Sequence, residues 1–152
     1  MTKKYNISIV TGIHSVEPAL RFRQEIFRDG KPGLDIDQFD ERCYHFLISD
    51  LASSKLVCVF RALLIGNSIN INNCYSSQFY DLRPLTSYDG EMLELGRFCV
   101  AKRVNDPAIL RLAWNALVGF IIKRKVTIVF GCSSFPGVDA HKHIQTFSLL
   151  KE

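Results

Sequence analysis

The spacing of apolar residues along the chain predicts a mixed α/β domain. Short apolar runs at 7–10, 44–49, 55–65, 93–100 and 126–132 are typical of strands. The runs 44–49 and 55–65 are joined by a short polar turn, which suits an antiparallel hairpin. Strands fall mainly in the first two-thirds of the chain, and a strand, helix, strand crossover follows near the end.

Two amphipathic helices are predicted from apolar residues that recur every three or four positions. The first runs over 16–27 with Ser15 as N-cap, and its apolar stripe consists of Val16, Ala19, Leu20, Ile26 and Phe27. Arg23 falls in the middle of this stripe. Its stem either packs while the charged head reaches solvent, or the head faces inward toward a functional position.

The second helix begins at Asp106 and Pro107, an N-cap residue followed by proline at the first helical position. Its apolar stripe consists of Ile109, Leu110, Ala113, Trp114, Leu117 and Ile121. The β-branched run 126–132 then predicts a strand buried on both faces. Asp139 is placed to cap a last helix, with Ile144, Phe147 and Leu150 on one side. The region 66–90 predicts a long irregular excursion that lines a site.

Charges inside the apolar run 93–100 are the most informative feature of the chain. Glu94 and Arg97 lie three residues apart in a segment that reads as a buried strand, with Gly96 between them. A buried charge is costly unless it is paired or faces a cleft. A glycine inside a strand often marks a β-bulge, which lets residues of opposite parity turn to the same face.

Further charges accompany this pair, and two interpretations stay open. Arg61 interrupts the apolar run 55–65, and Asp35, Asp37 and Asp40 follow the first helix. These groups form either one internal salt-bridge network or a charged cleft. A cleft with acidic residues and a glutamate on a strand would suit the recognition and deprotonation of an amine.

Composition narrows the possible classes of function. The chain has 152 residues and a net charge of +4. Its 47% of apolar residues are enough to form the core of a single domain spanning 1–152. Lys and Arg are scattered, which argues against nucleic-acid binding and leaves an acidic carrier protein or an anionic lipid surface as partner. The five cysteines form no C-x-x-C pair and are expected to be reduced. The N-terminal apolar run is too short for a signal or a membrane span, so we expect a cytoplasmic protein.

Two other chemistries are weaker. His141-x-His143 lacks zinc spacing, and the segment from Asp35 lacks the glycine and the terminal glutamate of a calcium loop, so no metal site is expected. A nucleophilic pair of Cys43 or Cys132 with His45 stays open. A lone cysteine on an apolar strand more often serves packing.

An ordered set of motifs resembles the ornithine-acyl carrier protein N-acyltransferases and, more distantly, the acyl-homoserine lactone synthases. The motifs are Arg23-Gln24-Glu25-Ile26-Phe27, Leu34-Asp35-x-Asp37-x-x-Asp40-x-x-Cys43-x-His45-Phe46-Leu47, Phe60-Arg61, Gln78-Phe79-x-Asp81-Leu82, Glu94-Leu95-Gly96-Arg97-x-Cys99-Val100 and Gly131-Cys132-Ser133-Ser134-Phe135. The resemblance runs from about residue 7 to the end. It implies the GNAT acyltransferase fold, a central mixed, mainly antiparallel sheet splayed between the Glu94 strand and the Cys132 strand.

The same resemblance implies an N-acyltransferase that moves a fatty acyl group, often hydroxylated, from acyl carrier protein or coenzyme A to ornithine or a related amine. Glu94 would be the general base with Arg97 as its organiser. The expected substrate-binding residues are Arg23, Phe27, Asp37, Asp40 and Arg61, and the expected donor-binding residues are Phe98, Cys99, Val100, Lys102, Arg103, Ser133 and Ser134. No tightly bound cofactor and no covalent cysteine is required, because the thiol is the leaving group.

Two departures from the family pattern matter. The stretch 101–107 lacks the glycines of a pyrophosphate loop, although Lys102, Arg103 and a helix N-terminus would suit the phosphate of a carrier's phosphopantetheine arm. The resembled enzymes also continue with further strands, which predicts a C-terminally shortened domain. Two alternatives therefore stand beside the transferase: an autoinducer synthase that acts on S-adenosylmethionine, and a non-catalytic module that binds an acyl group or its carrier. Acyl length, acceptor and oligomeric state are left open, as is peripheral contact with the inner face of the membrane.

Overall fold

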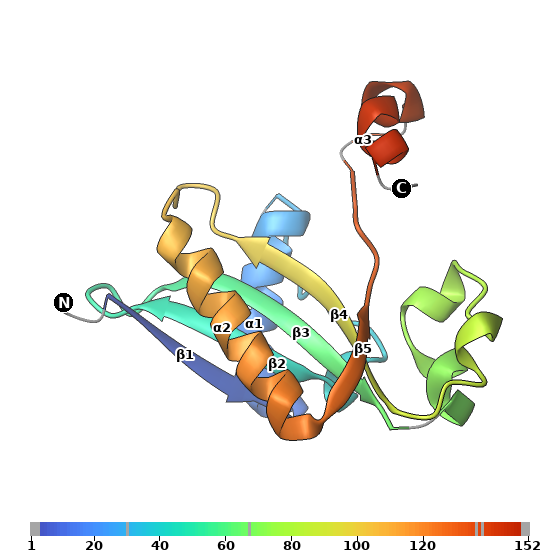
Figure 1. Cartoon of the computed structure of the whole chain (residues 1–152). Helices are drawn as coiled ribbons and strands as arrows, with labels where there is room; N and C mark the ends of the chain where they lie inside the picture. The colour runs from blue at the N-terminus through green and yellow to red at the C-terminus, as the bar shows by residue number, and fades with distance from the viewer. Residues whose placement is uncertain (1–3, 30, 67, 136, 138, 150–152) are drawn as a thin grey trace.

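One mixed sheet forms the centre of the chain in the computed structural model, which describes residues 4–29, 31–66, 68–135, 137 and 139–149 (Figure 1). The strands within these residues are β1 (Tyr5–Val10), β2 (Tyr44–Asp50), β3 (Leu56–Ile65), β4 (Glu91–Val100) and β5 (Val126–Phe130), in the order β1-β2-β3-β4-β5. All neighbours are antiparallel except β4 and β5, which are parallel. This confirms the expected mixed, mainly antiparallel sheet and the crossover near the end.

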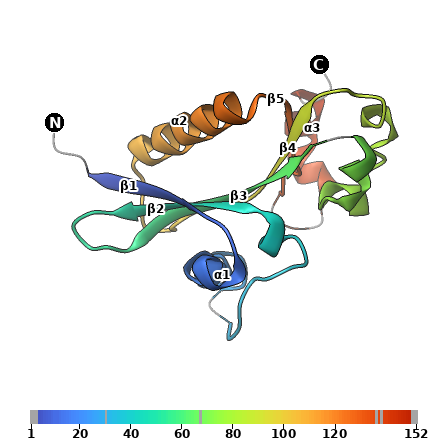
Figure 2. The same ribbon diagram turned by 90° about the horizontal axis from the view of Figure 1, so that it is seen from below.

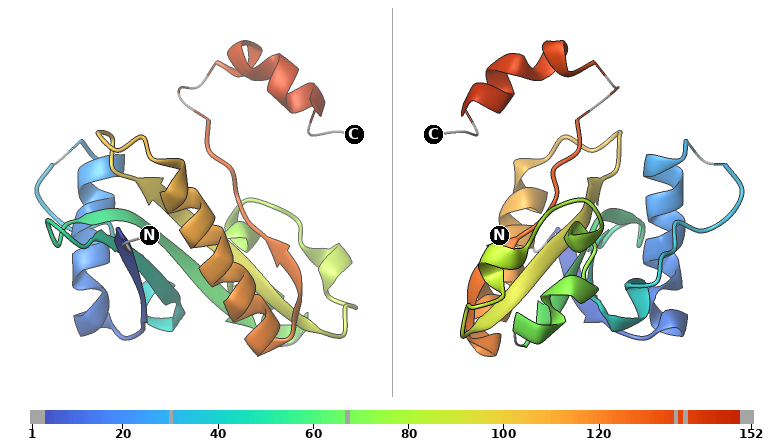
Figure 3. Two further views of the ribbon diagram at one scale, coloured as in Figure 1. Left: turned by 60° about the vertical axis from the view of Figure 1, so that its left-hand side comes forward. Right: turned by 90° about the vertical axis from the view of Figure 1, so that its right-hand side faces the viewer.

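Two helices cover opposite faces of the sheet, α1 (Ile13–Phe27) and α2 (Pro107–Arg124) (Figure 2). A short helix, α3 (Ile144–Leu149), follows the 3-10 turn Ala140–His143 and stands apart from the sheet (Figure 3). Asp139 caps this turn by accepting from the His141 N–H, as predicted. The predicted contact of Leu150 lies outside the described residues. No helix in the described ranges is long and apolar enough to cross a membrane.

The ends of α2 follow the predicted signals. The Asp106 side chain accepts from the Ala108 N–H, and Pro107 opens the helix. Lys123 and Arg124 lie in the last turn, where cations suit the helix dipole, and Lys125 ends the helix with a φ of 56°.

The start and the buried face of α1 differ from the prediction. The helix begins at Ile13, because Gly12 turns the chain with a φ of 82° and no side chain caps the helix. Phe27 is 42% exposed, while Phe22 is buried. Arg23 is only 1% exposed, so its head group faces inward rather than reaching solvent.

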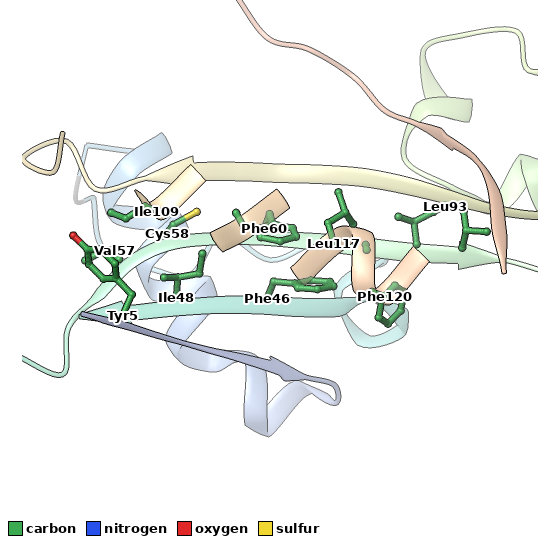
Figure 4. Packing of buried hydrophobic residues seen from close by; sticks show 13 residues of the cluster. Tyr5, Phe46, Ile48, Val57, Cys58, Phe60, Leu93, Ile109, Leu117 and Phe120 are labelled. Carbon is green, nitrogen blue, oxygen red and sulfur yellow. The ribbon is translucent and has the colours of Figure 1, made fainter. Parts of the chain in front are cut away.

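The main core fills the space between the sheet and α2 (Figure 4). Phe46 and Phe60 stack with ring centroids 4.4 Å apart, and Phe120 of α2 meets Phe46 edge-on at 5.5 Å. Leu117 and Ile109 of α2 are 1% exposed. Burying each such side chain stabilises the fold by roughly 1.5–3 kcal/mol.

Two predicted buried faces are exposed in the structure. Leu110 and Trp114 of α2 are 45% and 51% exposed, because Ile109, Ala113, Leu117 and Phe120 form the buried face of this helix. In β5 Thr127 and Val129 are exposed, since β5 lies at the edge of the sheet and is not covered on both sides.

The excursion between β3 and β4 contains three short 3-10 helices, Ser68–Asn73, Ser76–Gln78 and Arg83–Leu85. Its Ile71 and Cys74 are fully buried against Leu63 and Met92 of the neighbouring strands. This packing holds the excursion beside β4 and positions the residues that follow Cys74.

β4 and β5 separate at one point, next to a bulge. The register between β3 and β4 shifts between Val59 and Arg61, and Arg97 in the bulge has a φ of 53°. The last paired residues of β4 and β5 are Glu94 and Phe130. The chain after Gly131 then leaves the sheet (Figures 1 and 3). The predicted bulge and splay are confirmed, but Arg97 rather than Gly96 adopts the left-handed conformation.

Gly131, directly after β5, lies against the main chain of β4 at Leu95. A Cβ at this position would overlap the Leu95 carbonyl oxygen, which is backbone and cannot move cheaply. We expect Gly131→Ala to lower the free energy of unfolding by at least about 2 kcal/mol, as overpacking does.

Urea unfolding checks this prediction, and Gly119→Ala is the matched control. No atom lies within 4 Å of a Cβ added at Gly119, which is in the interior of α2. This variant should be more stable by roughly 0.5–1 kcal/mol. Equal stability of Gly131→Ala and wild type would contradict the role of Gly131.

Candidate functional site

Three arginines and three aspartates form one network on the α1 side of the sheet. Arg23 Nη1 lies 2.7 Å from Asp40 Oδ1, and Arg23 Nε lies 2.8 Å from Asp35 Oδ2. Arg61 Nη1 lies 2.7 Å from Asp37 Oδ1 and 2.5 Å from Asp40 Oδ1. Arg97 Nη2 lies 3.0 Å from Asp37 Oδ2. The network joins α1, β3 and β4 to the segment 35–40.

The segment 35–40 is folded so that its carboxylates converge. The Asp37 N–H donates to Asp40 Oδ2, and the Phe39 N–H donates to Asp37 Oδ1. Asp37 and Asp40 therefore hold the backbone of the turn as well as an arginine. The structure thus places Arg23, Asp37, Asp40, Arg61 and Arg97 together in one network.

Burial divides the network into an inner and an outer part. Arg23, Asp40 and Arg61 are at most 4% exposed, so they support the site from below. The side chains of Asp37 and Arg97 are each 20% exposed and form the outer edge. Phe27, predicted beside them, lies exposed at the end of α1 and outside the network.

The charges of the network shift the pKa values of its members. Burial raises the pKa of Asp40, but the hydrogen bond from Arg23 and the charges of Arg61 and Arg23 outweigh burial and lower it to about 2. The pKa of Asp37 is lowered in the same way, as the hydrogen bond and charge of Arg61 outweigh burial. Burial lowers the pKa of Arg61, and Asp37 and Asp40 raise it further than burial lowers it. All three groups stay ionised at neutral pH.

Glu94 lies outside this network and is bound by the excursion between β3 and β4. Its Oε2 accepts from the Tyr75 N–H at 2.9 Å, and its Oε1 accepts from the Ser76 N–H and the Ser76 hydroxyl, both at 2.6 Å. Glu94 is 6% exposed. Arg97 pairs with Asp35 and Asp37, at 3.2 Å and 3.0 Å, which agrees with the expectation that charges in this strand are either paired or face a cleft.

Tyr75 connects Glu94 with the network. The Arg97 guanidinium lies over the Tyr75 ring, 4.9 Å from its centroid, while the Tyr75 N–H binds Glu94. The bulge thus brings Glu94 and Arg97 against the same residue. Tyr75 and Ser76 were not found from the sequence, because two of their three hydrogen bonds to Glu94 come from the backbone.

A cysteine completes the group around Glu94. Cys132 is the first residue past Gly131, and its Sγ lies 3.2 Å from the Ser76 Oγ. Cys132 is half-buried, whereas Ser76 is 3% exposed. The Glu94 carboxylate, the Ser76 hydroxyl and the Cys132 thiol therefore follow one another in space where β4 and β5 separate.

The residues expected to bind the acyl donor do not all lie on one surface. Phe98 stacks on Phe60 and Trp114, with centroids 5.1 Å and 6.2 Å away. Cys99 is buried on the α1 side, where burial raises the pKa of its thiol to about 12. Val100 packs on the α2 side. The Cys99 side chain is thus buried and the Phe98 ring is half-buried, and direct donor binding by either side chain stays a prediction.

The other expected donor-binding residues are exposed. Lys102 pairs with Asp29 at 2.8 Å. Lys102 and Arg103 both line a cleft of ≈1270 Å³ between α1, the β2–β3 turn and the segment before α2. Lys102 is roughly 25 Å from Glu94 if β4 is fully extended. Ser133 and Ser134 are exposed in the chain that leaves β5.

The pair of Cys43 and His45 is not arranged for nucleophilic catalysis. Burial raises the pKa of the Cys43 thiol to about 12. His45 Nε2 lies 3.0 Å from the Asp40 carbonyl oxygen, and burial lowers the pKa of His45. Both side chains therefore support the turn below the network.

The network makes the free energy of unfolding depend on pH. The pKa of Asp40 is lower in the folded chain than in the unfolded one, so its contribution is present above about pH 4 and is lost as pH falls toward about 2. Asp40→Asn should lower the free energy of unfolding at neutral pH by about 3–5 kcal/mol, because two buried arginines lose their shared partner.

Urea unfolding measured between about pH 7 and about pH 2 checks this expectation. The wild type should lose stability more steeply than the variant below about pH 4. Asp81→Asn is the control, since Asp81 pairs with Arg83 on the surface and should change little. Parallel acid curves for wild type and Asp40→Asn would contradict the role of Asp40.

Curated relatives that resemble the chain are described as L-ornithine N(alpha)-acyltransferases. The protein of Rhodobacter capsulatus is 27% identical over 89% of this chain and 58% of its own length. That of Rhizobium meliloti is 30% identical over 80% of this chain and 43% of its own length. The chain thus spans about half the length of the curated relatives it matches.

A solved structure and a family model define the fold. The AHL synthase LasI matches with a TM-score of 0.61 at 12% identity, covering 96% of this chain and 77% of LasI. At this identity the likeness concerns the fold alone. The acetyltransferase (GNAT) domain model matches residues 20–115, which include both arginine-bearing strands and the start of α2. The chain therefore belongs to the acetyltransferase (GNAT) domain family.

Proposed function

We propose that this chain is an N-acyltransferase that moves a fatty acyl group from a thioester to the amine of ornithine or a related amino acid. The observation that carries the proposal is the position of Glu94. Its carboxylate lies where β4 and β5 separate, and Tyr75 connects it with the partly exposed Asp37 and Arg97. The names of the curated relatives support ornithine as acceptor.

Glu94 is the proposed general base. An α-amino group has a pKa near ~8 and is largely protonated at neutral pH, so it must lose a proton before it attacks. A carboxylate offers about four acceptor positions, and three of those of Glu94 are occupied by Tyr75 and Ser76. The Cys74 thiol also interacts with this carboxylate, and the amine or a bridging water would bind beside these groups.

Asp37 and Arg97 are the proposed contacts for the amino acid. They carry opposite charges at the outer edge of the network, which suits a ligand with both a carboxylate and an ammonium group. Among the described residues Arg97 makes a hydrogen bond only to Asp37, although a guanidinium has five N–H donors. Arg23, Asp40 and Arg61 position this pair from below.

The splay between β4 and β5 is the proposed place of the thioester. The backbone of β4 past Glu94 is not paired with β5, so the N–H groups of the bulge can reach the thioester carbonyl. Holding the two reactants together contributes ~7–11 kcal/mol, and an aligned oxyanion donor ~3–4 kcal/mol. Val100, Ser133 and Ser134 border this place, and Phe98 and Cys99 contribute backbone.

Acyl carrier protein is the proposed donor, with coenzyme A as the alternative. Lys102 and Arg103 are exposed cations at the end of β4, where an acidic carrier or its phosphate would dock. The same proposal places the chain in ornithine-lipid synthesis. A synthase acting on S-adenosylmethionine would instead yield a lactone, and a binding module would retain the carrier without turnover.

The test of the base is Glu94→Gln. With a fatty acyl thioester and ornithine, we expect its kcat to be about 10²–10⁴-fold lower than that of wild type, because proton transfer from the amine is lost. The measurement is the release of free thiol together with the mass of N-acylornithine. Glu91→Gln, on the same strand, is the matched control and should keep the wild-type rate.

Three outcomes would contradict the proposal. Glu94→Gln turning over like wild type would exclude Glu94 as base. A lactone product with S-adenosylmethionine would indicate the synthase. Carrier binding without thiol release for any amine would indicate a binding module.

The test of the donor is the double variant Lys102→Ala/Arg103→Ala. We expect KM for a carrier-linked donor to rise at least about tenfold and kcat to change little, because two docking charges are lost. A small pantetheine thioester should react with this variant as with wild type. Lys123→Ala, an exposed cation at the end of α2, is the control, and unchanged KM for the carrier in the double variant would argue for coenzyme A.

A further inference from the structure

A chain of three polar groups leads from Glu94 toward the open end of the splay. Glu94 Oε1 lies 2.6 Å from Ser76 Oγ, and Ser76 Oγ lies 3.2 Å from Cys132 Sγ. The three residues come from β4, from the excursion before it and from the chain past β5. They meet only because Gly131 lets the two strands approach at Leu95.

The chain runs from a buried group to an accessible one. Glu94 and Ser76 are 6% and 3% exposed, whereas Cys132 is half-buried. Ser76 thus covers the inner oxygen of the carboxylate, and Cys132 is the member of the chain nearest to solvent.

The hydrogen bonds that link Glu94, Ser76 and Cys132 have a defined donor and acceptor at each step. The Ser76 hydroxyl donates its single proton to Glu94 Oε1, so the Cys132 thiol is left to donate to Ser76 Oγ. A proton taken up by Glu94 reaches Ser76 once the protonated carboxyl has turned that oxygen toward the hydroxyl; both bonds then reverse, and the thiol proton points outward.

The Ser76 hydroxyl is not needed to hold Glu94. The Tyr75 N–H and the Ser76 N–H already bind one oxygen each, at 2.9 Å and 2.6 Å. The hydroxyl adds a third bond to an anchored carboxylate and is the atom that connects it with the thiol. This redundancy is what a relay, rather than a support, requires.

We propose that Ser76 and Cys132 relay the proton taken up by Glu94 to the thiolate that leaves the acyl donor, an inference that rests on the proposed function. The ammonium of the amino acid gives a proton to Glu94, and its nitrogen bonds to the thioester carbon. When the carbon–sulfur bond breaks, the electron pair stays on the sulfur. Cys132 protonates that sulfur, Ser76 reprotonates Cys132, and Glu94 reprotonates Ser76.

The step balances and needs no other reactant. One proton enters at Glu94, and one leaves on the free thiol. A second proton of the ammonium passes to bulk water as the amide forms, and the third stays on the amide nitrogen. The last transfer joins two groups of the same kind, the Cys132 thiol and an alkyl thiolate. No acyl group is carried by Cys132.

The test compares two donors with the same acyl group. A pantetheine thioester leaves as an alkyl thiolate that gains from protonation, and a thiophenyl ester leaves as a more acidic aryl thiolate that does not. With ornithine as acceptor, we expect Ser76→Ala to lower kcat about 10- to 100-fold for the pantetheine thioester and less than about threefold for the thiophenyl ester. A purely structural role of Ser76 would lower both rates alike.

Cys132 gives a second, independent variant in case Ser76→Ala does not fold. Cys132→Ala should show the same selective loss, and the double variant should be no slower than either single variant, because both interrupt one path. Ser77→Ala is the matched control, since the Ser77 hydroxyl binds the carbonyl oxygens of Asn72 and Cys74 instead of Glu94. Its effect, if any, should be equal for the two donors.

The outcomes separate the relay from the proposed function. Equal losses for both donors in Ser76→Ala and Cys132→Ala, or an acyl group found on Cys132 by mass spectrometry, would overturn the relay while acyl transfer stands. Wild type that transfers the acyl group from neither donor would overturn the proposed function and the relay with it.

Discussion

The buried network of arginines and aspartates is the constraint on which the site depends. Arg23 comes from a helix, Arg61 and Arg97 come from adjacent strands, and all three end on the turn 35–40. Removing one partner from such a network leaves an uncompensated charge in the core, so its members are mutually dependent. The network therefore supports the fold and the site at once. The sequence left two interpretations open, internal salt bridges and a charged cleft. The structure shows the salt bridges, and the cleft at Asp37 and Arg97 belongs to the proposed function.

Helix α2 and the charged strand β4 could be predicted because their signals are local. Asp106 and Pro107 define a helix start by their own chemistry, and Glu94 is conspicuous because a carboxylate rarely lies in an apolar run. The edge position of β5 could not be predicted, since Val129 has the same composition signal in an edge strand as in a central one. Exposure of that residue depends on what lies beyond it in space.

The partners of Glu94 were missed for a related reason. Tyr75 and Ser76 bind the carboxylate mainly through backbone N–H groups, which every residue except proline carries. Their position follows from the burial of Ile71 and Cys74, a packing event within the excursion. The sequence indicated that the excursion lines a site, but only tertiary structure identifies which peptide groups reach it.

The contact between Gly131 and Leu95 has a wider consequence. The vertex of the two diverging strands is set by main chain against main chain, and no side chain defines its geometry. Core residues on either face of the sheet can then change without widening or closing the splay between β4 and β5. Gly131, a single position without a side chain, preserves the splay, while the surrounding core is free to diverge.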